Sequence, residues 1–131
     1  MSLSNYGEAY ALDATLNSTN KWIALFTVMP AEDGTGGTEV STSGTGYDRV
    51  AATWAAAVQG APSTKNPAAP VSYATALTDW AAGATKIVGF GVYDASSGGN
   101  LVWTGALNTP RNILTGDTPE FAAAALTFRM D

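Results

Sequence analysis

The chain has 131 residues and a mass of 13.4 kDa, and its 6 Lys and Arg against 11 Asp and Glu give a net charge of −5. This length predicts a single domain over residues 1–131, and the acidic balance argues against binding of a nucleic-acid backbone, which requires clustered cations. The chain contains no cysteine and no histidine, which excludes disulfides, thiolate zinc sites, thiol nucleophiles and the commonest general base.

No membrane or targeting segment is predicted. The longest apolar stretches fall far short of the ~20 residues that cross a bilayer. Residues 1–12 mix polar and apolar side chains and lack a cationic region followed by an apolar run. We therefore expect neither a signal peptide nor a membrane partner.

A short amphipathic helix is predicted for Leu3–Leu16. Ser4 is in position to cap this helix, and the turn-forming residues Asn17–Asn20 end it. Apolar side chains recur at steps of three and four: Leu3, Tyr6, Tyr10 and Ala14, with Leu12 and Leu16 extending the apolar side. This side either covers one face of a sheet or docks on a partner.

After the helix the period of the sequence changes to two. Both alternating sets of side chains are largely apolar in Trp22–Met29, which predicts a strand buried on both faces and stopped by Pro30. The loop that follows, Ala31–Gly46, contains five glycines and is too long for a simple connection. It either contacts a partner or folds back on its own domain. A strand pattern resumes in Tyr47–Val58.

The second half of the chain carries the strongest strand patterns. Lys86–Tyr93 and Leu101–Ala106 both alternate, and the turn-rich segment Asp94–Asn100 joins them as a hairpin. Gly89 and Gly91 indicate a bend or close packing by a large neighbour. Shorter extended pieces are predicted at Val71–Tyr73, Arg111–Leu114, Pro119–Ala123 and Leu126–Met130, and a turn or single helical turn at Leu77–Trp80.

Several short strands separated by turn residues are typical of one fold class. We predict an all-β fold, an antiparallel β-sandwich or barrel with one short N-terminal helix. That helix is expected to pack against the sandwich.

Few catalytic chemistries remain open to this composition. The three lysines lie in no nucleophile motif, and acidic residues near turns also serve to bond the backbone. The loop acids Glu32, Asp33 and Glu39 lack the spacing of an EF-hand, and no phosphate-loop Lys follows the nearby glycines. We expect no enzymatic activity, no metal ion and no cofactor.

The four tryptophans raise the alternative of a carbohydrate-binding module. Trp22, Trp54 and Trp103 lie within strand patterns, which favours packing in the core. Trp80 lies in a turn and is the best candidate for a surface aromatic side chain.

Several short motifs follow one another in an order that spans nearly the whole chain. They are Leu3–Tyr6, Ile23–Thr27, Gly37–Ser41, Gly46–Tyr47, Arg49–Ala51, Gly89–Ala95, Ser97–Leu101, Thr104–Leu107, Gly116–Thr118 and Phe121–Thr127. In these motifs the chain resembles a family of small virion proteins of tailed phages, often labelled tail-fibre proteins. The segment Ala61–Tyr73 matches least well, and no catalytic motif is among the matching stretches.

The resemblance implies a non-enzymatic structural protein on the exterior of a phage particle, made in the cytoplasm of the bacterial host. Its partners would be other virion proteins, either the major capsid protein or tail proteins, and the chain would form a homo-oligomer, with a trimer as the first expectation. The short length favours a capsid decoration or cement protein, because shaft repeats and coiled-coil heptads are lacking. A small tail-fibre or tail-tip protein is the alternative.

Contact with partners is expected at two segments, the N-terminal stretch Ser2–Tyr10 and the loop Ala31–Gly46. The candidate contact residues are Leu3, Tyr6, Tyr10, Glu32, Asp33, Glu39 and Trp80.

Overall fold

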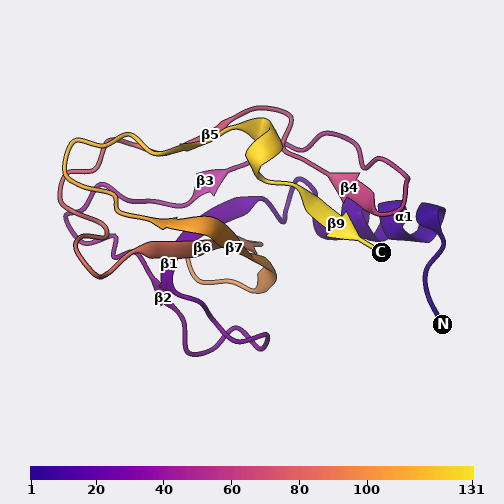
Figure 1. Cartoon of the computed structure of the whole chain (residues 1–131), viewed down its shortest axis with the longest axis horizontal. Coiled ribbons are helices and arrows are strands. Elements are labelled where there is room, and N and C mark those ends of the chain that lie inside the picture. Colours follow the sequence, from indigo (N-terminus) through magenta and orange to yellow (C-terminus); the bar gives the residue numbers. More distant parts are fainter.

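The computed structural model describes residues 1–131, and its largest element is a five-stranded antiparallel sheet (Figure 1). The sheet order is β2-β1-β6-β7, and β3 also pairs with β1. The strands are β1 (Trp22–Val28), β2 (Thr38–Glu39), β3 (Val50–Ala51), β6 (Ile87–Tyr93) and β7 (Leu101–Arg111). The predicted hairpin between β6 and β7 is confirmed, and β7 continues five residues beyond the predicted end at Ala106.

Close packing of glycine against aromatic rings shapes the centre of this sheet. A Cβ atom on Gly91 would lie 2.7 Å from the ring of Phe26, and one on Gly105 would lie 2.5 Å from the ring of Phe90. Only a residue without a side chain fits at either place. The expectation of a large neighbour packed on the β6 glycines is therefore confirmed.

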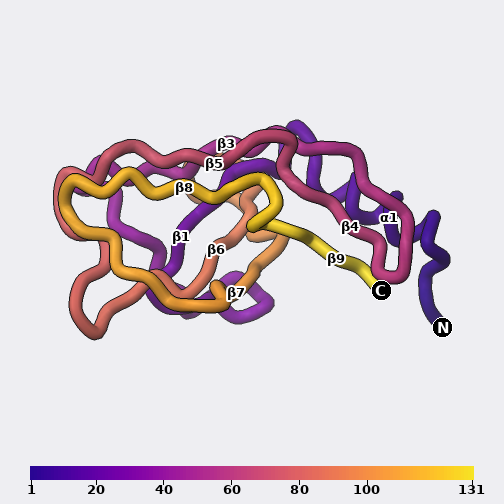
Figure 2. Tube along the Cα trace, turned by 45° about the horizontal axis from the view of Figure 1, so that its top comes forward, coloured from indigo at the N-terminus to yellow at the C-terminus, as the bar shows by residue number.

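Two short strand pairs complete the fold: one runs across the large sheet, and the other lies beyond its end, beside the N-terminal helix (Figures 1 and 2). One pair is β5 (Val71–Ser72) with β8 (Glu120–Phe121), and the other is β4 (Ser63–Lys65) with β9 (Phe128–Met130). A 3-10 turn, η1 (Ala123–Ala125), separates β8 from β9. A core of 17 buried residues joins these pairs to the large sheet, and the predicted all-β antiparallel fold with one N-terminal helix is confirmed.

The helix α1 (Asn5–Thr15) begins where the sequence predicts, because Ser4 Oγ accepts a 3.1 Å hydrogen bond from the backbone N–H of Gly7. The helix lies at one end of the molecule against β4 and β9 rather than over a face of the large sheet (Figure 1). Ion pairing of Lys65 with Asp13 and a hydrogen bond from Ser63 to Glu8 attach it there.

The buried side of α1 differs from the predicted one. Ala9 and Leu12 face the interior and Leu16 continues their line, whereas Leu3, Tyr6, Tyr10 and Ala14 are exposed. Burial of the predicted stripe against the sheet is therefore wrong.

None of the helices is long and apolar enough to cross a membrane, and α1 itself has only 11 residues.

The strand predicted at Tyr47–Val58 is mostly irregular. Only Val50–Ala51 forms a strand, on β1, and the chain then leaves the sheet. Trp54 makes an isolated bridge with Pro67, and Val58 makes one with Thr64. Inward packing of every second residue holds only for Val50, Ala52 and Trp54, and beyond them Ala56 and Val58 are exposed.

Candidate partner-binding surfaces

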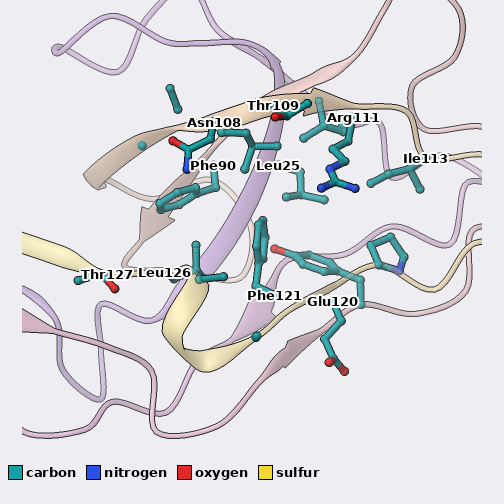
Figure 3. Close-up of a pocket in the computed structure, with 18 of the residues that line it drawn as sticks. Leu25, Phe90, Asn108, Thr109, Arg111, Ile113, Glu120, Phe121, Leu126 and Thr127 are labelled. Atoms are coloured by element: carbon teal, nitrogen blue, oxygen red, sulfur yellow. The ribbon is translucent and has the colours of Figure 1, made fainter.

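A cleft with a volume of about 1230 Å³ opens between β7 and the segment that runs from Asp117 to Arg129 (Figure 3). Here the large sheet and the β5–β8 pair do not meet, because β7 ends the large sheet and β8 pairs only with β5. Half-buried aromatic rings line the interior, with Phe90 and Phe121 at a centroid distance of 6.0 Å. Leu25 and Ile87 close the floor. The cleft is open and flanked by strand edges, and its lining is about half apolar and half polar.

Charged side chains on the rim of the cleft differ in how they are held. The guanidinium of Arg111 points into the cleft, whereas the carboxylate of Glu120 points away from it (Figure 3). Glu120 accepts a 2.7 Å hydrogen bond from the Ser72 hydroxyl, and Asp117 accepts one of 2.8 Å from a backbone N–H. Arg111 and Arg129 take part in neither ion pair of the chain. The rim therefore offers two cations without an internal partner.

A second unpartnered surface is the N-terminal arm, which we define as Met1–Ser4. The arm leads away from the body of the molecule in both views (Figures 1 and 2), and all four of its residues are exposed. Just beyond it, Tyr6 and Tyr10 are each 67% exposed and stack on one another with ring centroids 6.5 Å apart. The predicted contact residues Leu3, Tyr6 and Tyr10 thus form one apolar surface at the start of the chain.

The acidic loop, Ala31–Gly46, has an exposed tip and a base that is bonded to the rest of the domain. Glu32 and Asp33 are exposed at the tip, where the hydroxyl and backbone N–H of Thr35 bond Asp33 and lower the pKa of its carboxyl. Glu39 instead lies at the base, in β2. Both of its carboxylate oxygens are engaged, by a 2.8 Å ion pair to Arg49 and a 2.6 Å hydrogen bond from the Tyr47 hydroxyl. The loop therefore both exposes acids and folds back on its own domain.

The prediction of Trp80 as a surface aromatic is wrong. Its side chain is only 6% exposed, and its indole N–H donates a 2.8 Å hydrogen bond to the carbonyl of Thr45. The ring packs edge-on against Tyr47 and Tyr73, at centroid distances of 5.3 and 6.3 Å. The turn that carries Trp80 closes over this tyrosine pair, which local sequence does not reveal.

The other tryptophans are half-buried at the border of the core. Trp54 and Trp103 both pack edge-on against Phe128, at centroid distances of 5.4 and 5.6 Å. The indole N–H of Trp103 bonds the hydroxyl of Thr15 and so ties α1 to β7. Trp22 lies beside Lys21, whose ammonium is 5.6 Å from the ring. None of these rings forms a flat exposed platform with another tryptophan.

Groups that could hold a metal ion are also lacking. No three acidic side chains lie close enough together to share a cation, and the chain has no histidine or cysteine. The two surfaces that remain without an internal partner are the cleft and the N-terminal arm.

Comparison with known protein families identifies the family to which the chain belongs. The family model described as "Podophage GP4 fiber I protein gp80" matches residues 2–129. The chain belongs to this family of phage fibre proteins. A search of curated proteins gives no match. Membership confirms the resemblance to small phage virion proteins, and it makes the chain a structural protein of a phage particle.

The cleft is the part of this fibre-family protein that the sequence did not reveal. Its lining comes from β6, from β7 and from the segment after Asp117, together with Leu25 and Tyr73 from earlier in the chain. Each piece alone has the pattern of an ordinary half-buried strand. The one signal in the sequence was the alternation of β7, which places Leu101, Trp103 and Gly105 on one side of the strand. In the structure β7 is the last strand of its sheet.

Proposed function

We propose that the protein is a non-enzymatic component of a fibre on the exterior of a podophage particle. The single observation that carries this proposal is the family match, which covers 2–129 of 131 residues and names a fibre protein. Its role would be to bind other virion proteins, as a joint or tip of the fibre.

The chemistry of the two free surfaces supports binding rather than catalysis. The cleft combines aliphatic and aromatic side chains with polar ones, and its acids Asp117 and Glu120 are occupied by hydrogen bonds within the chain. The exposed arm and tyrosine pair offer apolar contact area. Large apolar surfaces rimmed by polar residues are typical of protein interfaces.

The fibre role is preferred to capsid decoration. Short length was the argument for decoration, but a single compact domain is also sufficient for one joint or tip of a fibre that other chains complete. The family match favours the fibre. A carbohydrate-binding role loses its main support, because Trp80 is buried.

The proposal includes self-association, with a trimer as the first expectation. Fibres are built from symmetric assemblies of identical chains, and cyclic symmetry leaves each copy with the same contacts. The tail proteins of the particle are the expected further partners.

Immunoelectron microscopy of intact particles tests the location. Antibodies against the purified chain should label a few sites at the tail vertex, and antibodies pre-absorbed with the same chain serve as the control. Regular labelling over the whole shell would replace the fibre role by capsid decoration.

A further inference from the structure

We infer that the cleft between β7 and β8 receives the N-terminal arm of a second copy of this chain, which adds to the free edge of β7 as a short strand. The inference rests on the proposed function only in requiring that the chain self-associates. It assigns the contact to two defined surfaces.

The free chain exposes more surface than a compact monomer of its size. Surface scaling with mass gives about 6,500 Å² for 13.4 kDa, whereas the chain exposes 7075 Å². The excess of about 600 Å² is close to the ~800 Å² that each partner contributes to a standard protein interface. The exposed surface is therefore large enough to include an interface of ordinary size.

The chain has fewer backbone hydrogen bonds than is typical, and β7 provides one of its free strand edges. The chain has 54 backbone–backbone hydrogen bonds, whereas roughly 90 are typical for 131 residues. β7 is the longest strand, yet it pairs only with β6, which leaves the groups along its other edge without a strand partner. Such an edge is a template for a strand from another chain.

The cleft beside that edge is suited to a chain segment. Its volume of about 1230 Å³ exceeds the ~300–1,000 Å³ of ordinary small-molecule pockets. The half-buried rings of Phe90 and Phe121 would become buried if apolar side chains filled the space between them. An added strand would supply such side chains at every second residue.

The arm has the pattern of that strand. Met1 and Leu3 alternate with Ser2 and Ser4, and the backbone at Ser4 is extended, with φ −71° and ψ 164°. Period two places both apolar side chains on one side of the strand and both serines on the other. The first ten residues also hold half of the large exposed apolar side chains of the protein: Met1, Leu3, Tyr6 and Tyr10 out of eight. The arm is therefore apolar surface without an internal partner.

Charge favours the N-terminal arm of a second copy over its acidic loop as the segment that fills the cleft. The net charge of −5 makes two copies repel each other. The arm and the residues up to Gly7 contain no Asp, Glu, Lys or Arg, so their one charge is the terminal ammonium of Met1. The rim of the cleft is balanced, with Arg111 and Arg129 against Asp117 and Glu120. Contact between these two regions therefore avoids the repulsion that the rest of the surface creates.

The two surfaces lie at different places on the molecule, so two copies can exchange arms about a two-fold axis, or each copy can pass its arm head-to-tail to the next. Head-to-tail contacts between identical chains close into rings when the rotation allows and otherwise continue as filaments. A closed ring of three copies would leave no arm and no cleft unoccupied. Either outcome suits a fibre component.

Cysteine cross-linking provides a direct test, because the natural chain has no cysteine. A Leu3→Cys variant is mixed with an Ala106→Cys or Ala122→Cys variant, whose exposed positions line the two sides of the cleft. One variant carries a heavy nitrogen isotope, so mass spectrometry distinguishes mixed disulfide dimers from pairs of like chains. The control partner is Ser97→Cys, at the exposed tip of the β6–β7 hairpin.

The inference requires mixed dimers with at least one cleft variant, in clear excess over those with the control. Equal yields with the control would overturn it. Ala106→Cys pairs that form without any Leu3 cross-link would also overturn it, in favour of β7 pairing with β7. A cross-link from Glu32→Cys to the cleft variants in place of Leu3→Cys would identify the acidic loop as the occupant.

Sedimentation of charge variants gives an independent measurement. Leu3→Asp should lose the oligomer, whereas Val58→Asp, which adds the same charge at an exposed apolar residue elsewhere, should keep it. Unchanged circular dichroism spectra would show that both variants fold. A monomeric natural chain, or a Leu3→Asp variant of unchanged mass, contradicts the arm-in-cleft contact, while labelling at the tail vertex would still support the fibre role.

Discussion

The hydroxyl of Tyr47 donates a 2.6 Å hydrogen bond to Oε2 of Glu39. The same oxygen of Tyr47 accepts a 3.0 Å hydrogen bond from the backbone N–H of Leu25 in the central strand β1. Burial, and then the bond to Glu39, raise the pKa of Tyr47 far above its ordinary value, so the hydroxyl remains a neutral donor. One phenol therefore joins the base of the acidic loop to the centre of the sheet.

Replacing this phenol tests how much it contributes. Tyr47→Phe keeps the ring and leaves the N–H of Leu25 without a partner in the core, so we expect the free energy of unfolding to fall by about 1–3 kcal/mol. Urea unfolding measures the change. Tyr6→Phe, at an exposed ring, is the matched control and should shift stability by less than about 0.5 kcal/mol. Equal effects of the two variants would contradict a structural role for the Tyr47 hydroxyl.

Arg49 holds the hairpin loop Asp94–Asn100 against the rest of the sheet. Its guanidinium pairs with Glu39, donates to the carbonyls of Ala95 and Gly98 at 2.9 and 2.8 Å, and lies 3.7 Å from the centre of the Tyr93 ring. The side chain of Arg49 is only 7% exposed.

Arg49→Met should therefore destabilise the fold by roughly 3 kcal/mol, because it leaves the Glu39 carboxylate without its cation. Hydrogen exchange should become faster in the hairpin loop before it does so elsewhere. Lys21→Met removes a half-buried cation that takes part in no ion pair, and it serves as the control. Protection in the loop that matches the natural chain would show that Arg49 does not hold it.

Alanine substitutions at two glycines should change the stability of the fold in opposite directions. A Cβ atom on Gly89 would lie 2.5 Å from the carbonyl oxygen of Gly105, so the β6–β7 pair must shift, and Gly89→Ala should destabilise by about 1–3 kcal/mol. Gly7 lies in α1, where the nearest atom would be 3.4 Å from the added Cβ. Gly7→Ala should stabilise by about 0.5–1 kcal/mol. Thermal unfolding of both variants checks the signs, and a stabilising Gly89→Ala would contradict the close approach of the two strands.

Acid should weaken the fold, and only at low pH. Four aspartates have a pKa below the ordinary 3.8 because they accept hydrogen bonds in the folded chain. The donors are the backbone of Asn100 for Asp94, the backbone of Thr115 for Asp79, the side chain of Lys65 for Asp13 and the side chain of Thr35 for Asp33. The unfolded chain binds these protons more readily than the folded chain. Their contribution to stability is therefore present above the unfolded pKa and is lost as the pH falls through the lower folded values.

Urea unfolding over a pH series measures this dependence. We expect the free energy of unfolding to decline below about pH 4 and to change little between about pH 5 and 8, since the chain has no histidine or cysteine. Asp94→Asn and Asp79→Asn together should make the acid decline shallower. A loss of stability centred near about pH 6 would be inconsistent with these groups.

Local patterns predicted the parts of the fold that local chemistry determines. The strands β1 and β6, the hairpin loop and the Ser4 cap all follow from residues within a few positions of one another. The buried side of α1 was missed because β4 and β9 decide it, and these strands lie far along the chain. Leu3, Tyr6 and Tyr10 have helical spacing, but spacing alone does not show whether a stripe faces the core or solvent.

The same limit applies to the candidate site. Arg111 and Phe121 had no distinguishing pattern in the sequence, and their cleft exists only because β7 and β8 do not meet across the sandwich. Trp80 was misplaced for the opposite reason. A turn residue is exposed by default, and only the distant partners Thr45 and Tyr47 bury this one.

The position of β9 determines how the protein would respond to tension. β9 pairs with β4 over three residues and supports α1, and both ends of the chain emerge at this side of the molecule (Figure 1). A pulling force between the two ends would act first on the pairing of β9 with β4 and would break its residue pairs one after another. Elements with few contacts unfold locally before the core does. The five register pairs between β1 and β6 would not carry this load. A fibre built from such units could lengthen under shear at α1 and β9 while each five-stranded sheet stayed intact.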